Sequence, residues 1–127
     1  MKIIIDTNFF LIPGELGVDI FEELEKTATF KYEIYVIDKT VDELNKIIDT
    51  QRGKYRGYAK LGLQLLKQRK IKTIKTETLK NVDELIIKHA KKGQTLVATQ
   101  DLALKRALKK KGVGIISLRQ KKRLIIQ

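Results

Sequence analysis

Cysteine is absent from this 127-residue chain, and that absence removes several classes of chemistry at once. A protein without cysteine has no disulfide bond, no thiolate nucleophile and no cysteine-ligated zinc or iron–sulfur centre. The chain has a single histidine, His89, which falls in the middle of a predicted helix with no serine motif nearby. We interpret His89 as an ordinary helix residue. Any hydrolytic chemistry must therefore rest on carboxylates and a metal ion.

Long apolar runs are also missing. No stretch approaches the roughly 20 apolar residues of a membrane-spanning helix. The first apolar run covers only residues 3–5 and ends at Asp6, which is not a signal-peptide pattern. We therefore expect a cytoplasmic protein. A hydrophobic fraction of 43% with 33% charged residues fits one globular domain, residues 1–127, with a heavily charged surface.

Acidic residues are scarce in the second part of the chain. Residues 1–51 contain 5 Lys/Arg and 11 Asp/Glu, whereas residues 52–127 contain 22 Lys/Arg and only 4 Asp/Glu. This asymmetry favours a polyanionic partner, with nucleic acid the first candidate, although lysine-rich surfaces also serve solubility. The four acids that remain in the basic part are Glu77, Asp83, Glu84 and Asp101. Each would weaken binding to phosphate unless it had another purpose.

Short β-branched runs alternate with amphipathic segments along the chain. Strands are predicted at 3–5, 34–37, 71–74, 95–99 and 113–118, and helices are predicted to start near 19, 40, 54, 81 and 101. This alternation is typical of a parallel α/β sheet. We predict a three-layer α/β/α sandwich with a mainly parallel five-stranded sheet in the order 3-2-1-4-5. Residues 9–14 are predicted to form an apolar loop, and whether 124–126 adds an edge strand stays open.

Carboxylates gather at one edge of this predicted sheet. Asp6 ends the first strand and Asp101 follows the fourth, and these two strands flank the point where the strand order reverses. Ligands bind at the carboxyl ends of the strands there, so we expect Asp6 and Asp101 to face each other. Glu43 lies just beyond the second strand and is expected at the same edge. Asp83 precedes the fourth strand and needs a long connection through residues 75–80 to reach it.

Each of these acids also has a purely structural interpretation. Glu43 forms a T-x-x-E capping box with Thr40. Asp83 and Asp101 fall in first helical turns, where the helix dipole favours a negative side chain by about 0.3–1 kcal/mol. These interpretations do not explain why two of the four acids in a basic region fall at the expected crevice.

The chemistry available to clustered carboxylates is limited. Packed together they repel one another and partly protonate unless a cation relieves the repulsion. An all-oxygen site without cysteine or a spare histidine suits Mg²⁺ or Mn²⁺. Such an ion activates water and stabilises negative charge that develops on phosphate. An acidic metal site within a basic surround therefore indicates phosphodiester hydrolysis.

Two basic segments are candidate contacts for RNA. Residues 51–58 interleave cations with tyrosines, and Arg52, Lys54, Tyr55 and Arg56 suit an RNA strand, whose phosphates meet cations while its bases stack on aromatic rings. The competing interpretation is a helix start with two partly buried tyrosines. Lys105 and Arg106, beside Asp101, either line an RNA path or form a solvated helix face.

Four segments of the chain together resemble the PIN domain. They are Asp6-Thr7-Asn8 after the first strand, Val41-Asp42-Glu43-Leu44, Val82-Asp83-Glu84-Leu85, and Val97-Ala98-Thr99-Gln100-Asp101. Residues 97–106 resemble the strand-4 motif of PIN nucleases of ribosome biogenesis. The resemblance covers nearly the whole chain and implies a divalent-metal-dependent endoribonuclease. It also implies that the metal ligands are Asp6, Glu43, Asp83 and Asp101. The supporting polar groups that it implies are Thr7, Asn8 and Thr99.

The resemblance leaves several questions open. Glu84 is an alternative to Asp83 as a ligand. The chain could be a VapC-type toxin with an antitoxin partner, a housekeeping nuclease of rRNA processing, or an RNA-binding PIN module that does not cleave. PIN proteins often form homodimers, and either the apolar 124–126 tail or the Phe9-Phe10 pair is a candidate contact.

Overall fold

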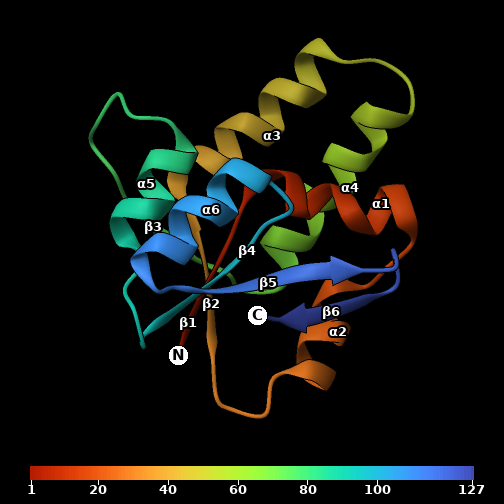
Figure 1. Ribbon diagram of the computed structural model, residues 1–127. Helices are drawn as coiled ribbons and strands as arrows, with labels where there is room; N and C mark the ends of the chain where they lie inside the picture. Colours follow the sequence, from red (N-terminus) through yellow and green to blue (C-terminus); the bar gives the residue numbers. More distant parts are fainter.

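The computed structural model describes residues 1–127 and is built on one central sheet (Figure 1). Its strand order is β3-β2-β1-β4-β5-β6. The strands are β1 (Lys2–Ile5), β2 (Glu33–Ile37), β3 (Lys72–Ile74), β4 (Thr95–Ala98), β5 (Gly114–Arg119) and β6 (Arg123–Ile126). The helices are η1 (Thr7–Leu11, a 3₁₀ helix), α1 (Ile12–Leu16), α2 (Ile20–Thr27), α3 (Asp38–Thr50), α4 (Lys54–Gln68), α5 (Val82–His89) and α6 (Leu102–Lys111).

The predicted order of the five parallel strands is confirmed, but the predicted number of strands is wrong. A sixth strand, β6, pairs antiparallel with β5 and places Leu124 opposite Leu118. The chain reverses through Gln120 and Lys121, whose φ angles of 54° and 57° lie in the left-handed region used by tight hairpin turns. Leu124 is buried, so pairing removes an apolar side chain from water as well as satisfying the edge of β5.

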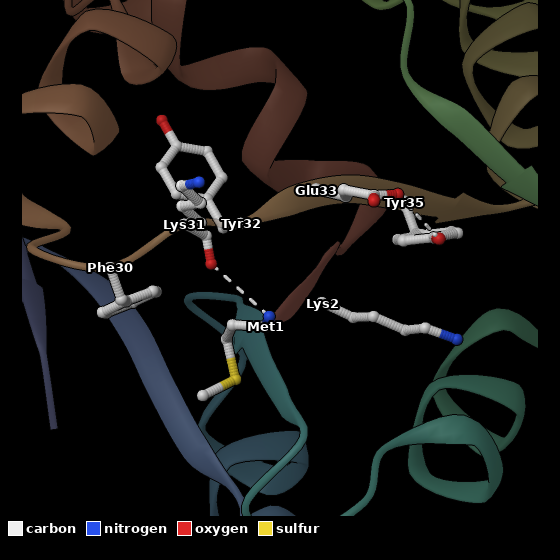
Figure 2. Close-up of a pocket in the computed structure, with 7 residues that line it drawn as sticks. All are labelled: Met1, Lys2, Phe30, Lys31, Tyr32, Glu33 and Tyr35. Atoms are coloured by element: carbon white, nitrogen blue, oxygen red, sulfur yellow. Dashed lines mark hydrogen bonds between the residues drawn. The ribbon is translucent and has the colours of Figure 1, made fainter.

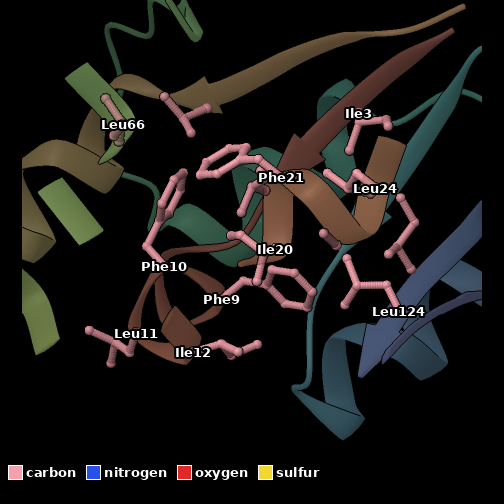
Figure 3. Packing of buried hydrophobic residues seen from close by; sticks show 14 of the residues in the cluster. Ile3, Phe9, Phe10, Leu11, Ile12, Ile20, Phe21, Leu24, Leu66 and Leu124 are labelled. Atoms are coloured by element: carbon pink, nitrogen blue, oxygen red, sulfur yellow. The ribbon is translucent and has the colours of Figure 1, made fainter. Parts of the chain in front are cut away.

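The two faces of the sheet are covered by different helices, and β1 contributes to both. Ile3 and Ile5 point into a core shared with η1, α1, α2 and α4, part of which is drawn in Figure 3. Ile4 points the other way, into a second core formed with α5 and α6. A continuous isoleucine run is what a strand buried on both faces requires. The three-layer prediction is confirmed.

The predicted loop at residues 9–14 is wrong, because the chain is helical from Thr7 to Leu16. The carboxylate of Asp6 accepts a hydrogen bond from the N–H of Thr7 and caps η1. Phe9 and Phe10 are 1% and 0% exposed, so η1 is held by core packing rather than by turn signals in its sequence. Because both rings are buried, the Phe9-Phe10 pair does not offer a dimer contact.

Helix α4 begins at Lys54, as predicted, and most of its expected apolar face packs on the core. Of the residues that helical spacing places inward, Leu66 is buried and Tyr58 and Leu65 are half-buried, but Leu61 is 36% exposed. Ala59, Gly62 and Leu63 are also buried. A Cβ atom at Gly62 would lie only 2.4 Å from the carbonyl oxygen of Phe10. The absence of a side chain at Gly62 is therefore what lets α4 pack directly against η1.

Two helix boundaries and the burial of one residue differ from what the sequence predicts. Helix α3 begins at Asp38, two residues before the expected start at Thr40. Helix α5 ends at His89 rather than at Gly93. Leu102 was expected to be buried and is 67% exposed, because it is the first residue of α6 and faces water. No helix in the structure is long and apolar enough to span a membrane.

Candidate active site

Asp6 lies at the carboxyl end of β1, next to the end of β4. Its side chain is almost fully buried, with the residue 5% exposed. The Oδ1 atom accepts a hydrogen bond from the N–H of Thr7 at 2.8 Å, and Oδ2 accepts one from the hydroxyl of Thr99 at 2.8 Å. Since β1 and β4 pair in register with Ile5 opposite Ala98, strand pairing itself brings Asp6 and Thr99 together.

Burial changes the acid–base behaviour of Asp6. Desolvation is the main cause that raises its pKa from an ordinary 3.8 to about 6. The hydrogen bonds from Thr99 and Thr7 oppose that rise, while the negative charges of Asp83 and Glu43 add to it. A buried carboxyl whose pKa is raised by desolvation and by two other acids is a group that a cation would stabilise.

Asp101 is the N-cap of α6 and is also connected to Asp6. Its Oδ1 atom accepts a hydrogen bond from the N–H of Leu104 at 2.9 Å, so the structural interpretation of this acid is correct. Its own N–H donates to the hydroxyl of Thr99 at 3.1 Å. The hydroxyl of Thr99 therefore links Asp101 to Asp6. Capping uses one carboxylate oxygen and leaves the other free, so the capping and site roles are compatible.

Glu43 does not form the expected capping box with Thr40. Because α3 begins at Asp38, Thr40 lies inside the helix and Glu43 belongs to its second turn. The Oε1 atom of Glu43 accepts a hydrogen bond from the hydroxyl of Thr7 at 2.7 Å, and that hydroxyl is also 3.2 Å from Thr40 Oγ1. Thr7, the residue after Asp6, thus connects η1 to α3 and holds Glu43 at the same edge. The role of Thr40 was missed from the sequence, because the T-x-x-E spacing fits a cap equally well.

Asp83 reaches this edge more simply than expected. Helix α5 follows β3 and returns to β4, so its first turn begins at the carboxyl edge, as in any βαβ crossover. Burial raises the pKa of Asp83, and the charges of Asp101 and Glu43 raise it further. Asp83 in turn raises the pKa of Asp6. Its charge therefore acts on the other acids of the edge, and Glu84 is not among the causes of these shifts.

A clamp that the sequence did not reveal holds the connection before Asp83. Asp38, the first residue of α3, accepts hydrogen bonds from the N–H of Thr76 at 2.8 Å and from its hydroxyl at 2.6 Å. The ammonium of Lys39 donates to the carbonyl oxygens of Thr78 and Lys80. Burial acts to raise the pKa of Asp38, but the hydrogen bonds from Thr76 and from the Lys39 N–H outweigh it and lower the pKa. The available signal was positional, since an Asp directly follows β2 just as Asp6 follows β1.

The donor atoms at this edge suit a hard divalent cation, although they do not form a closed cage. The side chains of Asp6, Glu43, Asp83 and Asp101 offer only oxygen atoms, which Mg²⁺ and Mn²⁺ prefer. No group of three or more His, Cys, Asp or Glu side chains stands close enough to hold a metal ion on its own.

The remaining polar and basic candidates lie around these acids. Asn8 is exposed on η1, where its side chain makes no hydrogen bond. Arg52, Lys54, Tyr55 and Arg56 are exposed at the tip of the α3–α4 hairpin (Figure 1). Seven helical residues separate Glu43 from the end of α3, which places that tip about 10 Å beyond Glu43. The competing interpretation holds in part, because Tyr58 is half-buried while the neighbouring Tyr55 is 42% exposed.

Lys105 and Arg106 follow Asp101 by about one helical turn of α6. Arg106 is exposed, and Lys105 is half-buried with its pKa lowered by burial and by the charge of Lys109. All four ion pairs of the chain lie elsewhere, so neither cation is neutralised by a carboxylate.

The largest cavity is far from the acids. It has a volume of about 540 Å³ and lies at the amino ends of β1 and β2. Figure 2 shows its lining: Met1, Lys2, Phe30, Lys31, Tyr32, Glu33 and Tyr35. The carboxylates project instead from the opposite edge of the sheet.

The chain is similar, over nearly its whole length, to two proteins named as ribonucleases. It is 29% identical over 122 residues to a protein named Ribonuclease VapC4 from Methanocaldococcus jannaschii, covering 95% of this chain and 92% of that one. It is 27% identical over 125 residues to Ribonuclease VapC9 from Archaeoglobus fulgidus, covering 98% of this chain and 87% of that one.

Solved structures give the same picture of the fold. The PIN domain endonuclease Utp24 matches with a TM-score of 0.77 and 25% identity, covering 99% of this chain and 90% of that chain. A domain of a functionally unknown protein from Methanocaldococcus jannaschii matches in fold alone, with a TM-score of 0.62 and 18% identity over 93% of this chain and 91% of that chain. The family described as "PIN like domain" matches residues 3–121. This protein therefore belongs to the PIN-like domain family.

Proposed function

We propose that this protein is a divalent-metal-dependent endoribonuclease whose ligands are Asp6, Glu43, Asp83 and Asp101. The observation that carries the proposal is Asp6, which is buried and held by two hydrogen bonds, with its pKa raised to about 6 by burial and by the charges of Asp83 and Glu43. Ionising a buried acid next to other negative charges lowers the stability of the fold, and a bound cation would offset that cost. The relatives named as ribonucleases and as an endonuclease support the same activity.

The chain's own residues would divide the work by position. Asp6 provides the fixed ligand, because Thr7 and Thr99 hold both of its oxygens in place. Glu43 and Asp83 complete the acidic edge from α3 and α5, and Asp101 does so from α6. When bound, Mg²⁺ or Mn²⁺ supplies a Lewis acid that activates water and neutralises charge on the phosphate. Asn8 is exposed beside Asp6 and is available to contact substrate.

The basic residues would hold the RNA strand on either side of the acids. Lys105 and Arg106 on α6 are unpaired cations close to Asp101. Arg52, Lys54 and Arg56 offer a second set of phosphate contacts at the hairpin tip, where Tyr55 exposes a ring on which a base can stack. An RNA strand bound at both sets crosses the acidic edge between them.

Cleavage of a labelled RNA with Mg²⁺ or Mn²⁺, and without metal, tests the activity directly. We expect cleavage with either ion and none in EDTA. Asp6→Asn keeps the shape of the side chain, removes its charge, and should abolish cleavage while the protein stays folded. Metal-dependent cleavage by folded Asp6→Asn would disprove the ligand assignment. A wild-type protein that binds RNA but never cuts it would instead be a silent RNA-binding module.

We further propose that the protein acts as a VapC-type toxin, since both named ribonuclease relatives are VapC proteins that match over nearly their whole length. An antitoxin protein, encoded beside it, would then be its partner. The alternative is rRNA processing, for which the support is the resemblance of residues 97–106 to the strand-4 motif of ribosome-biogenesis nucleases. Growth arrest on expression, relieved by co-expressing the neighbouring gene, would favour the toxin. Accumulation of an rRNA precursor when the protein is depleted would favour the alternative.

Homodimer formation is a further part of this proposal. With Phe9 and Phe10 buried, the remaining candidate contact is the β6 edge, where Ile126 is 36% exposed. Sedimentation of the wild type beside Ile126→Glu tests this contact, and we expect the charge to shift a dimer to a monomer.

A further inference from the structure

A second, smaller cavity lies at the amino edge of the sheet, beneath the C-terminal end of α5. Its volume is about 190 Å³. Its lining combines polar and cationic side chains with an apolar floor: Lys2, His89, Lys91, Gln94 and Thr95 over Ile4 and Ile74. No acidic residue lines it. The cavity is on the opposite edge from Asp6 and takes no part in the proposed cleavage.

Positive charge converges on this cavity from several elements. The charges that act on His89, its one titratable lining residue besides the lysines, come from Lys88, Lys91, Lys111 and Lys2. Burial and these four charges together lower the pKa of His89. Neither Lys2 nor Lys91 forms an ion pair, and Glu33, which stands opposite Lys2 on β2, is already paired with Lys72. The positive charge here is therefore not neutralised within the protein.

The turn that forms one wall is fixed by its own hydrogen bonds. The N–H groups of Gln94 and Thr95 both donate to the carbonyl oxygen of Lys91 at 3.0 Å. The hydroxyl of Thr95, which is 3% exposed, accepts a hydrogen bond from the N–H of Lys91 at 3.2 Å and keeps its own proton for another acceptor. These bonds hold the turn in a fixed shape, and the donors that it leaves free beside the ammonium groups are the Thr95 hydroxyl and the side-chain amide of Gln94.

We propose that this cavity binds a phosphate group. A cavity with several ammonium and neutral donors and no carboxylate matches the charge and hydrogen-bonding needs of a phosphate. Its size accommodates one phosphate and excludes a folded protein segment. The group belongs either to an RNA strand that extends beyond the cleavage edge or to a small free phosphate compound.

The larger cavity shown in Figure 2 adjoins the proposed phosphate site. Lys2 lines both cavities, and its ammonium lies 5.2 Å from the centre of the Tyr35 ring. Phe30 and Tyr32 stand on the far side of the larger cavity, with ring centres 6.3 Å apart. A phosphate held by Lys2 would therefore lie near the half-buried ring of Tyr35.

His89 is the sole histidine, so its ring proton gives one resolved NMR signal that reports on the cavity. Inorganic phosphate is titrated into the wild-type protein in EDTA at constant ionic strength. We expect a saturable shift of the His89 signal and a higher His89 pKa, because a bound anion offsets the four lysine charges. In Lys91→Gln, which changes an exposed side chain, the affinity should fall at least about tenfold.

Lys88→Gln is the matched control, because Lys88 acts on His89 electrostatically but does not line the cavity. It should change the phosphate affinity by no more than about twofold. No saturable shift in the wild type, or an equal loss in Lys88→Gln and Lys91→Gln, would overturn the proposal. Both readouts are made without divalent metal, so they stand apart from any failure of the cleavage assay.

A short RNA titrated into the same variants identifies the source of the phosphate. If Lys91→Gln weakens RNA binding as well as phosphate binding, the RNA backbone reaches this edge. If it weakens phosphate binding alone, the site belongs to a small phosphate compound. Either result upholds the anion site.

Discussion

The hydroxyl of Thr99 donates a hydrogen bond to Oδ2 of Asp6 at 2.8 Å and bridges the carboxyl ends of β4 and β1. The same hydroxyl accepts the N–H of Asp101 at 3.1 Å. One side chain that binds no cation therefore sets the orientation of two acids. The contact is buried, so water cannot replace it at no cost.

Thr99→Val tests this relationship, since valine keeps the shape of threonine without its hydroxyl. We expect the free energy of unfolding to fall by about 1–3 kcal/mol, because a buried acid loses a partner. Cleavage should fall by about 10–100-fold, the usual effect of removing a group that orients a metal ligand. Thr99→Ser retains the hydroxyl and serves as control. Equal losses in both variants would point to packing instead.

The ionisation of Asp6 should make stability depend on pH in a defined direction. Its pKa is about 6 in the folded protein against an ordinary 3.8, so the folded state holds the proton more tightly. The cost of ionising Asp6 is absent below about pH 4 and complete above about pH 6. A shift of about 2 pH units corresponds to about 3 kcal/mol. Asp6→Asn should therefore stabilise the protein by up to about 3 kcal/mol at pH 7.5 and not at pH 3.5.

Urea unfolding of wild type and Asp6→Asn at these two pH values, in EDTA, measures that difference. The same substitution is expected to remove cleavage, so stability and activity should move in opposite directions. A stability difference that is the same at both pH values would show that ionisation of Asp6 is not its origin.

Asp83 and Glu84 offer a paired comparison on one helical turn. The charge of Asp83 raises the pKa of Asp6, and Asp83 is itself affected by Asp101 and Glu43. We expect Asp83→Asn to lower the pKa of Asp6 and to reduce cleavage at least about a hundredfold, equivalent to about 2.7 kcal/mol of transition-state stabilisation. Glu84→Gln should change the cleavage rate by no more than about threefold and should leave the pKa of Asp6 unchanged. Cleavage rates and the carboxyl titration of Asp6 by NMR distinguish the two acids, and the reverse ranking would assign the ligand to Glu84.

Asp38 should control the connection that precedes Asp83. Asp38→Ala removes the acceptor of two hydrogen bonds from Thr76, and bonds of this kind to a carboxylate contribute about 1.5–3 kcal/mol each. We expect faster hydrogen exchange at the Thr76 N–H, lower stability and slower cleavage. Asp42→Ala, an exposed acid of the same helix, is the control. Unchanged exchange at Thr76 in Asp38→Ala would show that the connection is held by other contacts.

RNA binding by the basic residues should depend on salt. Replacing Lys105 or Arg106 with Gln should weaken RNA binding and make its logarithmic salt dependence less steep by about 0.7 for each phosphate that is no longer neutralised. Lys26→Gln is a suitable control, because Lys26 lies on α2 and already pairs with Glu22 and Glu23. Titration in several salt concentrations without divalent metal gives the slopes. A flat salt response would exclude the basic region as the binding surface.

The sequence predicted those parts of the site that follow from strand order alone. Asp6 follows the end of β1, and Asp101 lies three residues after the end of the adjacent parallel strand β4. A β-branched run followed by an acid can be recognised in the sequence, and in the structure Thr99, between β4 and Asp101, contacts Asp6. Strand order does not predict η1 and α1, which depend on the burial of Phe9 and Phe10 against α4.

Strand order also does not predict the partner of Glu43, which is Thr7 rather than Thr40. Glu43 lies in the second turn because α3 begins at Asp38, and Asp38 accepts hydrogen bonds from Thr76, 38 residues away. A contact over that separation leaves no local pattern in the sequence.

The close packing of Gly62 against Phe10 fixes the point on η1 from which α4 extends to the hairpin tip. Eight residues of helix separate Lys54, at the tip of the hairpin, from Gly62, and they span about 12 Å. Because Gly62 rests directly on η1, that span is measured from the segment that follows Asp6. The distance between the proposed RNA contacts and the cleavage edge is thus set by the number of residues in one helix. Adding or removing a turn of α4 between Lys54 and Gly62 would move the hairpin tip along a bound RNA without altering any of the proposed metal ligands.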